Sequence, residues 1–167
     1  MLLANKIYNQ GGAGGLTISS VTANVKNIVS GGGTHFEIWS DSGGSGSSPV
    51  SQIGQDSEVK TPSGTGDITF NFAPGIAVPA AGSKFWVIIQ AAGGDINYNR
   101  GSLGSATGVT GGDFEASATI TNLVSASTII PRFTVTFSDG TTAGLASGTT
   151  GIGMGASLSM GLLITNA

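Results

Sequence analysis

Two short runs with strict alternation of side chains constrain the fold of this chain more than any other feature. In residues 68–72, Ile and Phe alternate with Thr and Asn, and in residues 85–89 Phe, Val and Ile occupy every second position. A connection rich in Pro and Gly separates the two runs. Because successive side chains of a strand point to opposite faces of a sheet, a period of two predicts two strands with one face in the core.

The rest of the chain repeats this pattern in shorter pieces. Apolar residues alternate over residues 34–40 and 132–138, and Gly- and Ser-rich stretches separate the runs. The 29 Gly residues exceed the usual share of roughly 7%, and helix formers such as Glu and Lys are scarce. A change of phase at Ser19 and Ser20 indicates a bulge. The sequence therefore predicts an all-β fold, a two-sheet antiparallel sandwich that is jelly-roll-like and has eight to ten short strands.

The length of 167 residues suits one domain with a two-sheet core. We expect residues 1–15 to form an N-terminal arm or edge strand and residues 16–140 to form the sandwich. Residues 141–167 are expected to form a Gly-rich apolar C-terminal strand or assembly arm of the same domain. This last segment is rich in Gly, Ser and Thr and lacks flanking basic or aromatic anchors, which argues against a membrane span.

The chain carries few charges, with 6 Lys and Arg, 9 Asp and Glu, and a net charge of −3. The basic residues are spread singly and form no stripe that could neutralise phosphates, so the composition argues against a nucleic-acid partner. Two explanations fit so neutral a surface. Either other copies of the chain cover it, or uncharged Ser, Thr and Asn side chains keep it soluble.

Residues that carry out catalysis or hold metals are scarce. The chain has one histidine, His35, no cysteine and no Gly-x-Ser-x-Gly motif. A zinc site usually needs several His or Cys, and the motifs of calcium-binding and phosphate-binding loops are also missing. We therefore predict no enzyme activity, no catalytic residue, no metal and no cofactor. His35, Glu37 and Trp39 share one face of their predicted strand, which is either an exposed strand face or a ligand surface.

Three aromatic residues lie outside the predicted core pattern. Trp39 and Trp86 fall on the faces opposite the core-facing side chains, and Tyr98 has Asn neighbours and Arg100 close in sequence. Flat rings beside amide and guanidinium groups can stack on sugars and hydrogen-bond their hydroxyls. These four residues are therefore candidates for glycan binding, with packing in the core or in an interface as the alternative.

A resemblance to a known module covers about residues 18–92. Three stretches carry it: SVTANV at 20–25, HFEIWSDSGGSGSSP at 35–49 and DITFNFAPGIAVPAAGSKFWVIIQA at 67–91. They resemble the choice-of-anchor R domain, whose strands show a Tyr/Trp-Ser-Asp ending, a Gly/Ser-Pro loop and a later Phe-x-Phe and Tyr/Phe-Trp-Val pattern. The resemblance implies a non-catalytic β-sandwich surface domain, of a kind often found on secreted proteins with a C-terminal anchor.

The N-terminal sequence MLLANKIYNQGG does not resemble a signal peptide, so we expect a chain made in the cytoplasm. A surface module made in this way fits a virion or extracellular assembly. We therefore expect a structural protein of a phage particle, such as a capsid decoration, head-fibre or tail-appendage subunit. Its partners would be its own copies and other virion proteins. The residues expected to mediate assembly are Leu2, Leu3, Ile152, Met154, Leu158, Leu162, Leu163 and Ile164.

Two other functions remain open at this stage. One is a carbohydrate-binding surface module that uses the aromatic residues named above. The other is a subunit of an extracellular filament.

Overall fold

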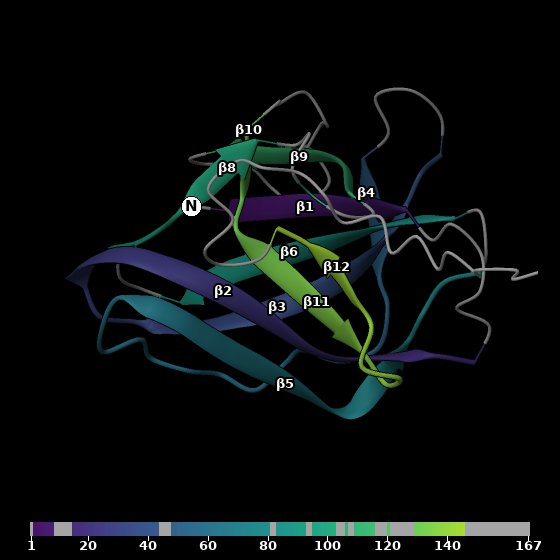
Figure 1. Cartoon of the computed structure of the whole chain (residues 1–167), viewed down its shortest axis with the longest axis horizontal. Coiled ribbons are helices and arrows are strands. Elements are labelled where there is room, and N and C mark those ends of the chain that lie inside the picture. Colours follow the sequence, from purple (N-terminus) through teal and green to yellow (C-terminus); the bar gives the residue numbers. More distant parts are fainter. Residues whose placement is uncertain are drawn as a thin grey trace, which may run out of the picture.

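The computed structural model describes residues 2–8, 15–43, 48–80, 83–92, 95–102, 106, 109–115, 120 and 129–145. These residues form β-strands and no α-helix, which confirms the all-β prediction (Figure 1). The strands are β1 (Leu2–Tyr8), β2 (Thr17–Ser30), β3 (Gly33–Asp41), β4 (Pro49–Gln52), β5 (Gly66–Ala77), β6 (Lys84–Ala92), β7 (Asp95–Tyr98), β8 (Arg100–Ser102), β9 (Val109–Glu115), β10 (Ile129–Pro131), β11 (Phe133–Phe137) and β12 (Thr142–Gly144). This is more than eight to ten strands, because β8, β10 and β12 are too short for an alternating pattern to reveal them.

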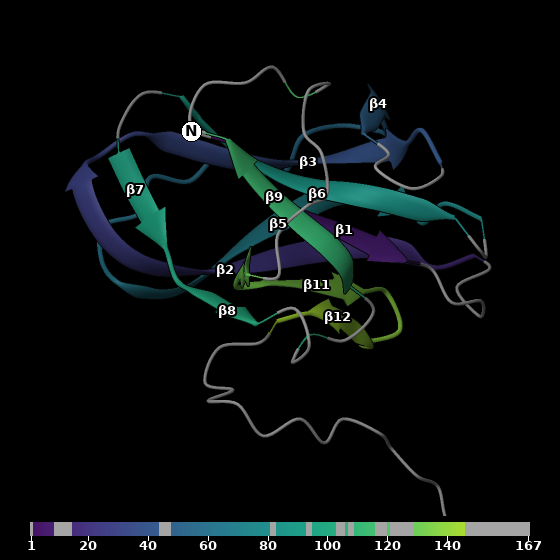
Figure 2. The ribbon, with the colours of Figure 1, turned by 90° about the horizontal axis from the view of Figure 1, so that it is seen from above.

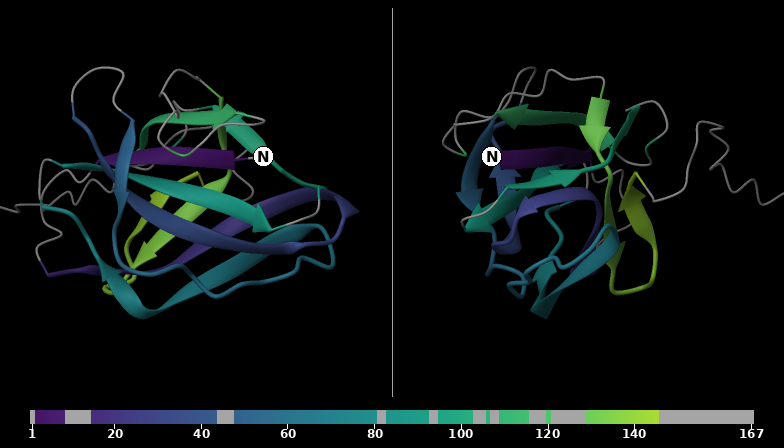
Figure 3. Two further views of the ribbon diagram at one scale, coloured as in Figure 1. Left: turned by 180° about the vertical axis from the view of Figure 1, so that it is seen from behind. Right: turned by 90° about the vertical axis from the view of Figure 1, so that its left-hand side faces the viewer.

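The strands form two antiparallel sheets. We call the first sheet A, with the order β4-β3-β6-β1-β9, and the second sheet B, with the order β12-β11-β2-β5. β7 pairs with the far end of β2, and β8 and β10 form a separate two-stranded ribbon. Figure 3 shows the sheets as two layers of a sandwich. Every strand pairing in the described part of the chain is antiparallel, as predicted.

The two sheets are aligned so that β1 lies near β12 and β3 lies near β5. Edge strands β4 and β5 are therefore on one side of the sandwich, which we call the β4–β5 side. Edge strands β9 and β12 are on the opposite side, which we call the β9–β12 side. Figure 2 shows β4 and β12 on opposite sides of the molecule. This arrangement matters for function because each side presents a different pair of sheet edges.

Apolar side chains from both sheets fill the space between the layers. Phe36 of sheet A packs edge-to-face on Phe70 and Phe133 of sheet B, with ring centroids 5.1 and 4.9 Å apart. Such pairs contribute about 1 kcal/mol each beyond the burial of their area. Most of the alternating residues predicted to face inward are buried in this core, namely Phe36, Ile38, Phe70, Phe72, Phe85, Val87, Ile89, Phe133 and Val135. Ile68 and Phe137 are partly buried and pack against it. The predicted bulge is also confirmed, because the register of β2 shifts between Ile18 and Ser20.

The N-terminal strand corrects one prediction. β1 is neither an arm nor an edge strand, because it lies between β6 and β9 in sheet A. Leu3 is part of the core. On the same face of β1 as Leu3, Asn5 is buried and donates from Nδ2 to the Pro131 carbonyl oxygen at 3.1 Å, so the end of β10 lies against β1. The sandwich thus includes the segment that sequence alone set apart.

The C-terminal boundary also moves. Residues 141–145 belong to the sandwich, which fits the strand alternative of the prediction, because β12 pairs with β11 and the side chains of Ala143 and Leu145 are buried. Residues 146–167 lie outside the described residues, and with them six of the residues predicted to mediate assembly: Ile152, Met154, Leu158, Leu162, Leu163 and Ile164.

Candidate functional site

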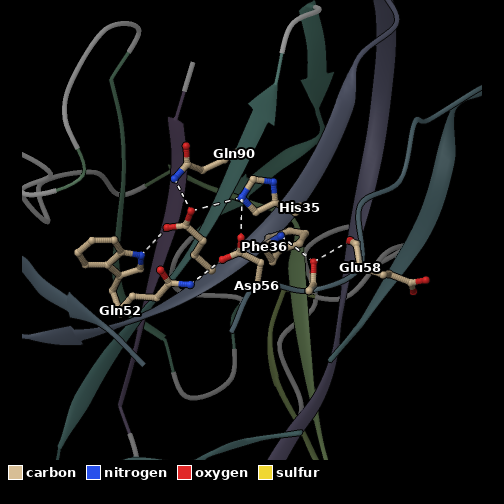
Figure 4. A network of polar contacts seen from close by, with 9 residues as sticks. His35, Phe36, Gln52, Asp56, Glu58 and Gln90 are labelled. Atoms are coloured by element: carbon tan, nitrogen blue, oxygen red, sulfur yellow. Dashed lines mark hydrogen bonds and ion pairs between the residues drawn. The ribbon is translucent and has the colours of Figure 1, made fainter. Parts of the chain in front are cut away.

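A polar cluster on the outer face of sheet A is the first candidate site. The alternation of β3 directs Phe36 and Ile38 into the core and turns His35, Glu37 and Trp39 to the other face, as predicted. The side chains of this stripe contact one another and residues of the neighbouring strands (Figure 4).

Glu37 is the centre of this cluster. Its carboxylate accepts hydrogen bonds from Trp39 Nε1 at 2.6 Å and from Gln90 Nε2 at 2.5 Å, and His35 Nε2 lies 3.3 Å from its Oε1. The residue is only 7% exposed. A buried carboxylate needs donors to replace the water it has lost, and Trp39 and Gln90 supply two of them.

Asp56 completes the cluster from the connection between β4 and β5. Its Oδ2 lies 3.8 Å from His35 Nε2, and its Oδ1 accepts a hydrogen bond from Gln52 Nε2 at 2.6 Å. His35, Glu37 and Asp56 each offer one ligand atom within 4.8 Å of the others. The sequence predicted no metal site, because no local pattern shows that Asp56 lies beside His35 in the folded chain.

Trp86 occupies the same face of sheet A but is fully buried. Lys6 Nζ lies 4.8 Å from the centroid of its ring, and Trp86 Nε1 donates to Asp41 Oδ1 at 2.7 Å. Burial lowers the pKa of Lys6, and the charge of Asp41, 4.0 Å away, acts against this shift. Of the two interpretations left open for Trp86, packing fits the structure and a sugar-stacking surface does not, because β1 supplies a cover that the sequence pattern did not reveal.

A groove where β7 meets β2 is the second candidate site. It encloses about 610 Å³ and is lined by Lys26, Asn27, Asn97, Tyr98, Asn99 and Arg100. Lys26 is an extra residue in β2, because the register passes from Val25 opposite Tyr98 directly to Asn27 opposite Asn97. A bulge of this kind turns two successive side chains to the same side, and both Lys26 and Asn27 are exposed. The groove therefore combines two cations with three amide groups.

Tyr98 contributes little polar surface to this groove. It is only 6% exposed, and its ring packs edge-to-face on Phe133 at 6.0 Å. Burial raises the pKa of Tyr98 to about 12, with the nearby Thr34 side chain acting in the opposite direction. For Tyr98 as well, packing in the core fits the structure and a sugar-stacking surface does not, because β7 continues the inward pattern of sheet B.

The four predicted glycan-binding residues thus do not form one site. Trp39 and Trp86 are register partners in sheet A, whereas Tyr98 and Arg100 line the groove beside sheet B. Of the predicted assembly residues, Leu2 pairs through its backbone with Glu115, and Leu3 is buried in the core. Lys26 and Asp56 were not predicted as site residues.

Comparisons with known proteins give no family for this chain. No protein-family model matches it, and neither the curated proteins nor the solved structures contain a match. In the part of the chain that the structure describes, no helix is long and apolar enough to cross a membrane.

Proposed function

We propose that this protein is a non-enzymatic structural subunit of a particle such as a phage virion. In this proposal it works on a virion or another extracellular assembly and binds its own copies and other particle proteins through sheet packing and its C-terminal segment. The observation that supports the proposal is the asymmetry of the sandwich, in which the chain covers its own edge on one side and the last described strand, β12, ends a sheet on the other.

The β4–β5 side is closed by the chain itself. The Glu58 backbone nitrogen donates to the Asn71 carbonyl oxygen at 2.9 Å, and the Glu58 carboxylate accepts from the Asn71 backbone nitrogen at 2.9 Å. Lys60 Nζ donates to the Thr69 carbonyl oxygen at 2.6 Å. These contacts satisfy edge groups of β5 that would otherwise pair with another strand, which disfavours assembly through this edge.

The β9–β12 side differs. β12 is an end strand of sheet B in the described part of the chain, and only Leu145 follows it there. The sequence then continues through residues 146–167, which contain Ile, Leu and Met but no charged side chain. An apolar segment that starts at a sheet edge is well placed to pair with or pack on a neighbouring subunit.

The test is the mass of the full chain in solution. We expect the wild-type protein to sediment as an oligomer and the double variant Leu162→Asp, Leu163→Asp to sediment as a monomer, because charges in an apolar interface oppose its burial. The circular-dichroism spectrum should stay that of β-structure.

A matched control places two Asp residues on the closed side. Val50 and Val59 are 53% and 65% exposed, so Val50→Asp with Val59→Asp should leave the oligomer intact. A wild-type chain that remains monomeric at high concentration would contradict the proposal.

A second candidate function, carbohydrate binding, is favoured by the groove between β2 and β7. Amide groups can donate to and accept from sugar hydroxyls, and Lys26 and Arg100 add positive charge. This composition suits acidic glycans, which carry carboxylate or sulfate groups, better than neutral ones.

A glycan array tests this candidate directly. We expect wild-type protein to bind acidic glycans and the variant Lys26→Ala, Arg100→Ala to lose that binding at least tenfold. Lys84→Ala is the control, because Lys84 lies at the start of β6 and not in the groove. Equal binding of neutral glycans, or unchanged binding by the double variant, would exclude the groove as the site.

A further inference from the structure

We propose that His35, Glu37 and Asp56 form a binding site for a divalent metal ion of the zinc type. His35 and Glu37 belong to β3, and Asp56 belongs to the connection that follows β4. The proposal is independent of the assembly function, because it concerns the outer face of sheet A and the β4–β5 side.

The spacing of the ligand atoms fits a small tetrahedral ion. Zinc bonds of about 2.0–2.1 Å place two ligand atoms about 3.3 Å apart. His35 Nε2 and Glu37 Oε1 are 3.3 Å apart, and His35 Nε2 and Asp56 Oδ2 are 3.8 Å apart. All three atoms lie within 4.8 Å of one another. Since the Asp56 side chain is 51% exposed, a small rotation can bring its oxygen to the required distance.

The charge balance of the cluster also favours a cation. Two carboxylates face one imidazole, and among the described residues the ion pairs of Glu37 and Asp56 involve only His35. When the imidazole is neutral, the two negative charges have no cationic partner, and a divalent ion would neutralise both. One nitrogen and two carboxylate oxygens form a donor set that zinc accepts.

Neighbouring side chains hold both carboxylates in place. Trp39 Nε1 bonds to Glu37 Oε2, the oxygen that faces away from His35. Gln52 Nε2 likewise bonds to Asp56 Oδ1 and leaves Oδ2 toward His35. Such outer partners orient metal ligands and strengthen binding. The exposed Asp56 side leaves room for a water molecule as the fourth ligand.

A metal ion here would join the connection between β4 and β5 to the face of β3. This connection also covers the edge of β5 through Glu58 and Lys60. An ion that binds the folded chain but not the unfolded chain raises the free energy of unfolding by mass action. We therefore expect zinc to raise the melting temperature of the full-length protein.

The direct test uses the single histidine of the chain as a reporter. We expect one equivalent of ZnCl₂ to shift the only imidazole signals in the NMR spectrum and to bind with a stoichiometry of one per chain by calorimetry. CoCl₂ should give the visible absorption of a tetrahedral cobalt site. CaCl₂ should produce no shift, because calcium binds oxygen ligands and does not use an imidazole.

Variants then assign the ligands. His35→Asn and Asp56→Asn should each weaken zinc binding at least tenfold. Glu58→Gln is the matched control and should bind as the wild type does, because Glu58 is two residues from Asp56 but contacts Lys60 and Asn71 instead. An unshifted imidazole with zinc in excess over the wild-type chain would overturn the proposal, as would full binding by His35→Asn.

Discussion

At Tyr98, a hydroxyl group is buried without a hydrogen-bond partner among the described residues. Thr34 Oγ1, its polar neighbour, donates instead to the Lys60 carbonyl oxygen at 3.0 Å. A buried group without a partner costs free energy, so Tyr98→Phe should raise the free energy of unfolding at pH 7 by about 1 kcal/mol. Urea denaturation measures this change.

The same substitution should alter the dependence of stability on pH. The pKa of Tyr98 is raised to about 12 in the folded protein, from a model-compound value of 10.0. The folded protein therefore disfavours the ionised form of Tyr98 more than the unfolded chain does. The free energy of unfolding keeps its full value below pH 10 and falls as the pH rises from 10 to 12, by about 3 kcal/mol in total. Tyr98→Phe should lack this loss, and Tyr8→Phe should keep it. Equal pH profiles for the two variants would show that the Tyr98 hydroxyl is not buried.

Single residues also show why the sequence revealed only part of the sites. The face on which Trp39 and Trp86 lie follows from alternation alone, and this prediction is correct. Exposure does not follow from alternation, because it depends on Lys6 and Asp41, which reach Trp86 from other strands. Contacts between strands that are distant in sequence leave no local pattern that a single sequence can show.

Among the strands, β12 depends on one glycine. Gly144 has a φ of +124°, and a Cβ added there would meet the carbonyl oxygen of Phe133. Gly144→Ala should therefore lower the free energy of unfolding by about 3 kcal/mol, through backbone strain and the displacement of β12 from β11. Gly64→Ala is the control, because nothing lies within 4 Å of an added Cβ, and it should change stability by less than about 0.5 kcal/mol. Comparable losses in urea denaturation would contradict this account of β12.

Some strands could be predicted from their sequence and others could not. β3, β5, β6 and β11 were predicted correctly, since one apolar face per strand leaves a period of two. β1 was misplaced because Leu3, Ala4, Asn5, Lys6 and Ile7 are all buried, so neither face has the polar pattern of an exposed surface. A strand covered on both faces resembles any short apolar segment.

For the whole molecule, the sequence predicted the antiparallel sandwich but not the order of its strands or the boundaries of the domain. Alternation and Gly-rich turns are sufficient for an antiparallel sandwich, whereas the strand order requires knowing which strands pair over long distances. The boundary at residue 140 was placed at a turn signal, Asp139-Gly140, and the turn exists, with Thr141 bonded to Asp139. The chain nevertheless returns after it, since β12 pairs back onto β11.

The cluster of His35, Glu37 and Asp56 is separate in space from the proposed assembly surface. The cluster of His35, Glu37 and Asp56 involves β3 and the β4–β5 side, and the groove lies where β7 meets β2. The proposed assembly surface is on the β9–β12 side, where β12 ends at Gly144. A subunit that packs through the β9–β12 side would therefore keep the cluster accessible. This separation is what a surface component of a particle requires, because contacts with its neighbours and contacts with ligands must be made at the same time.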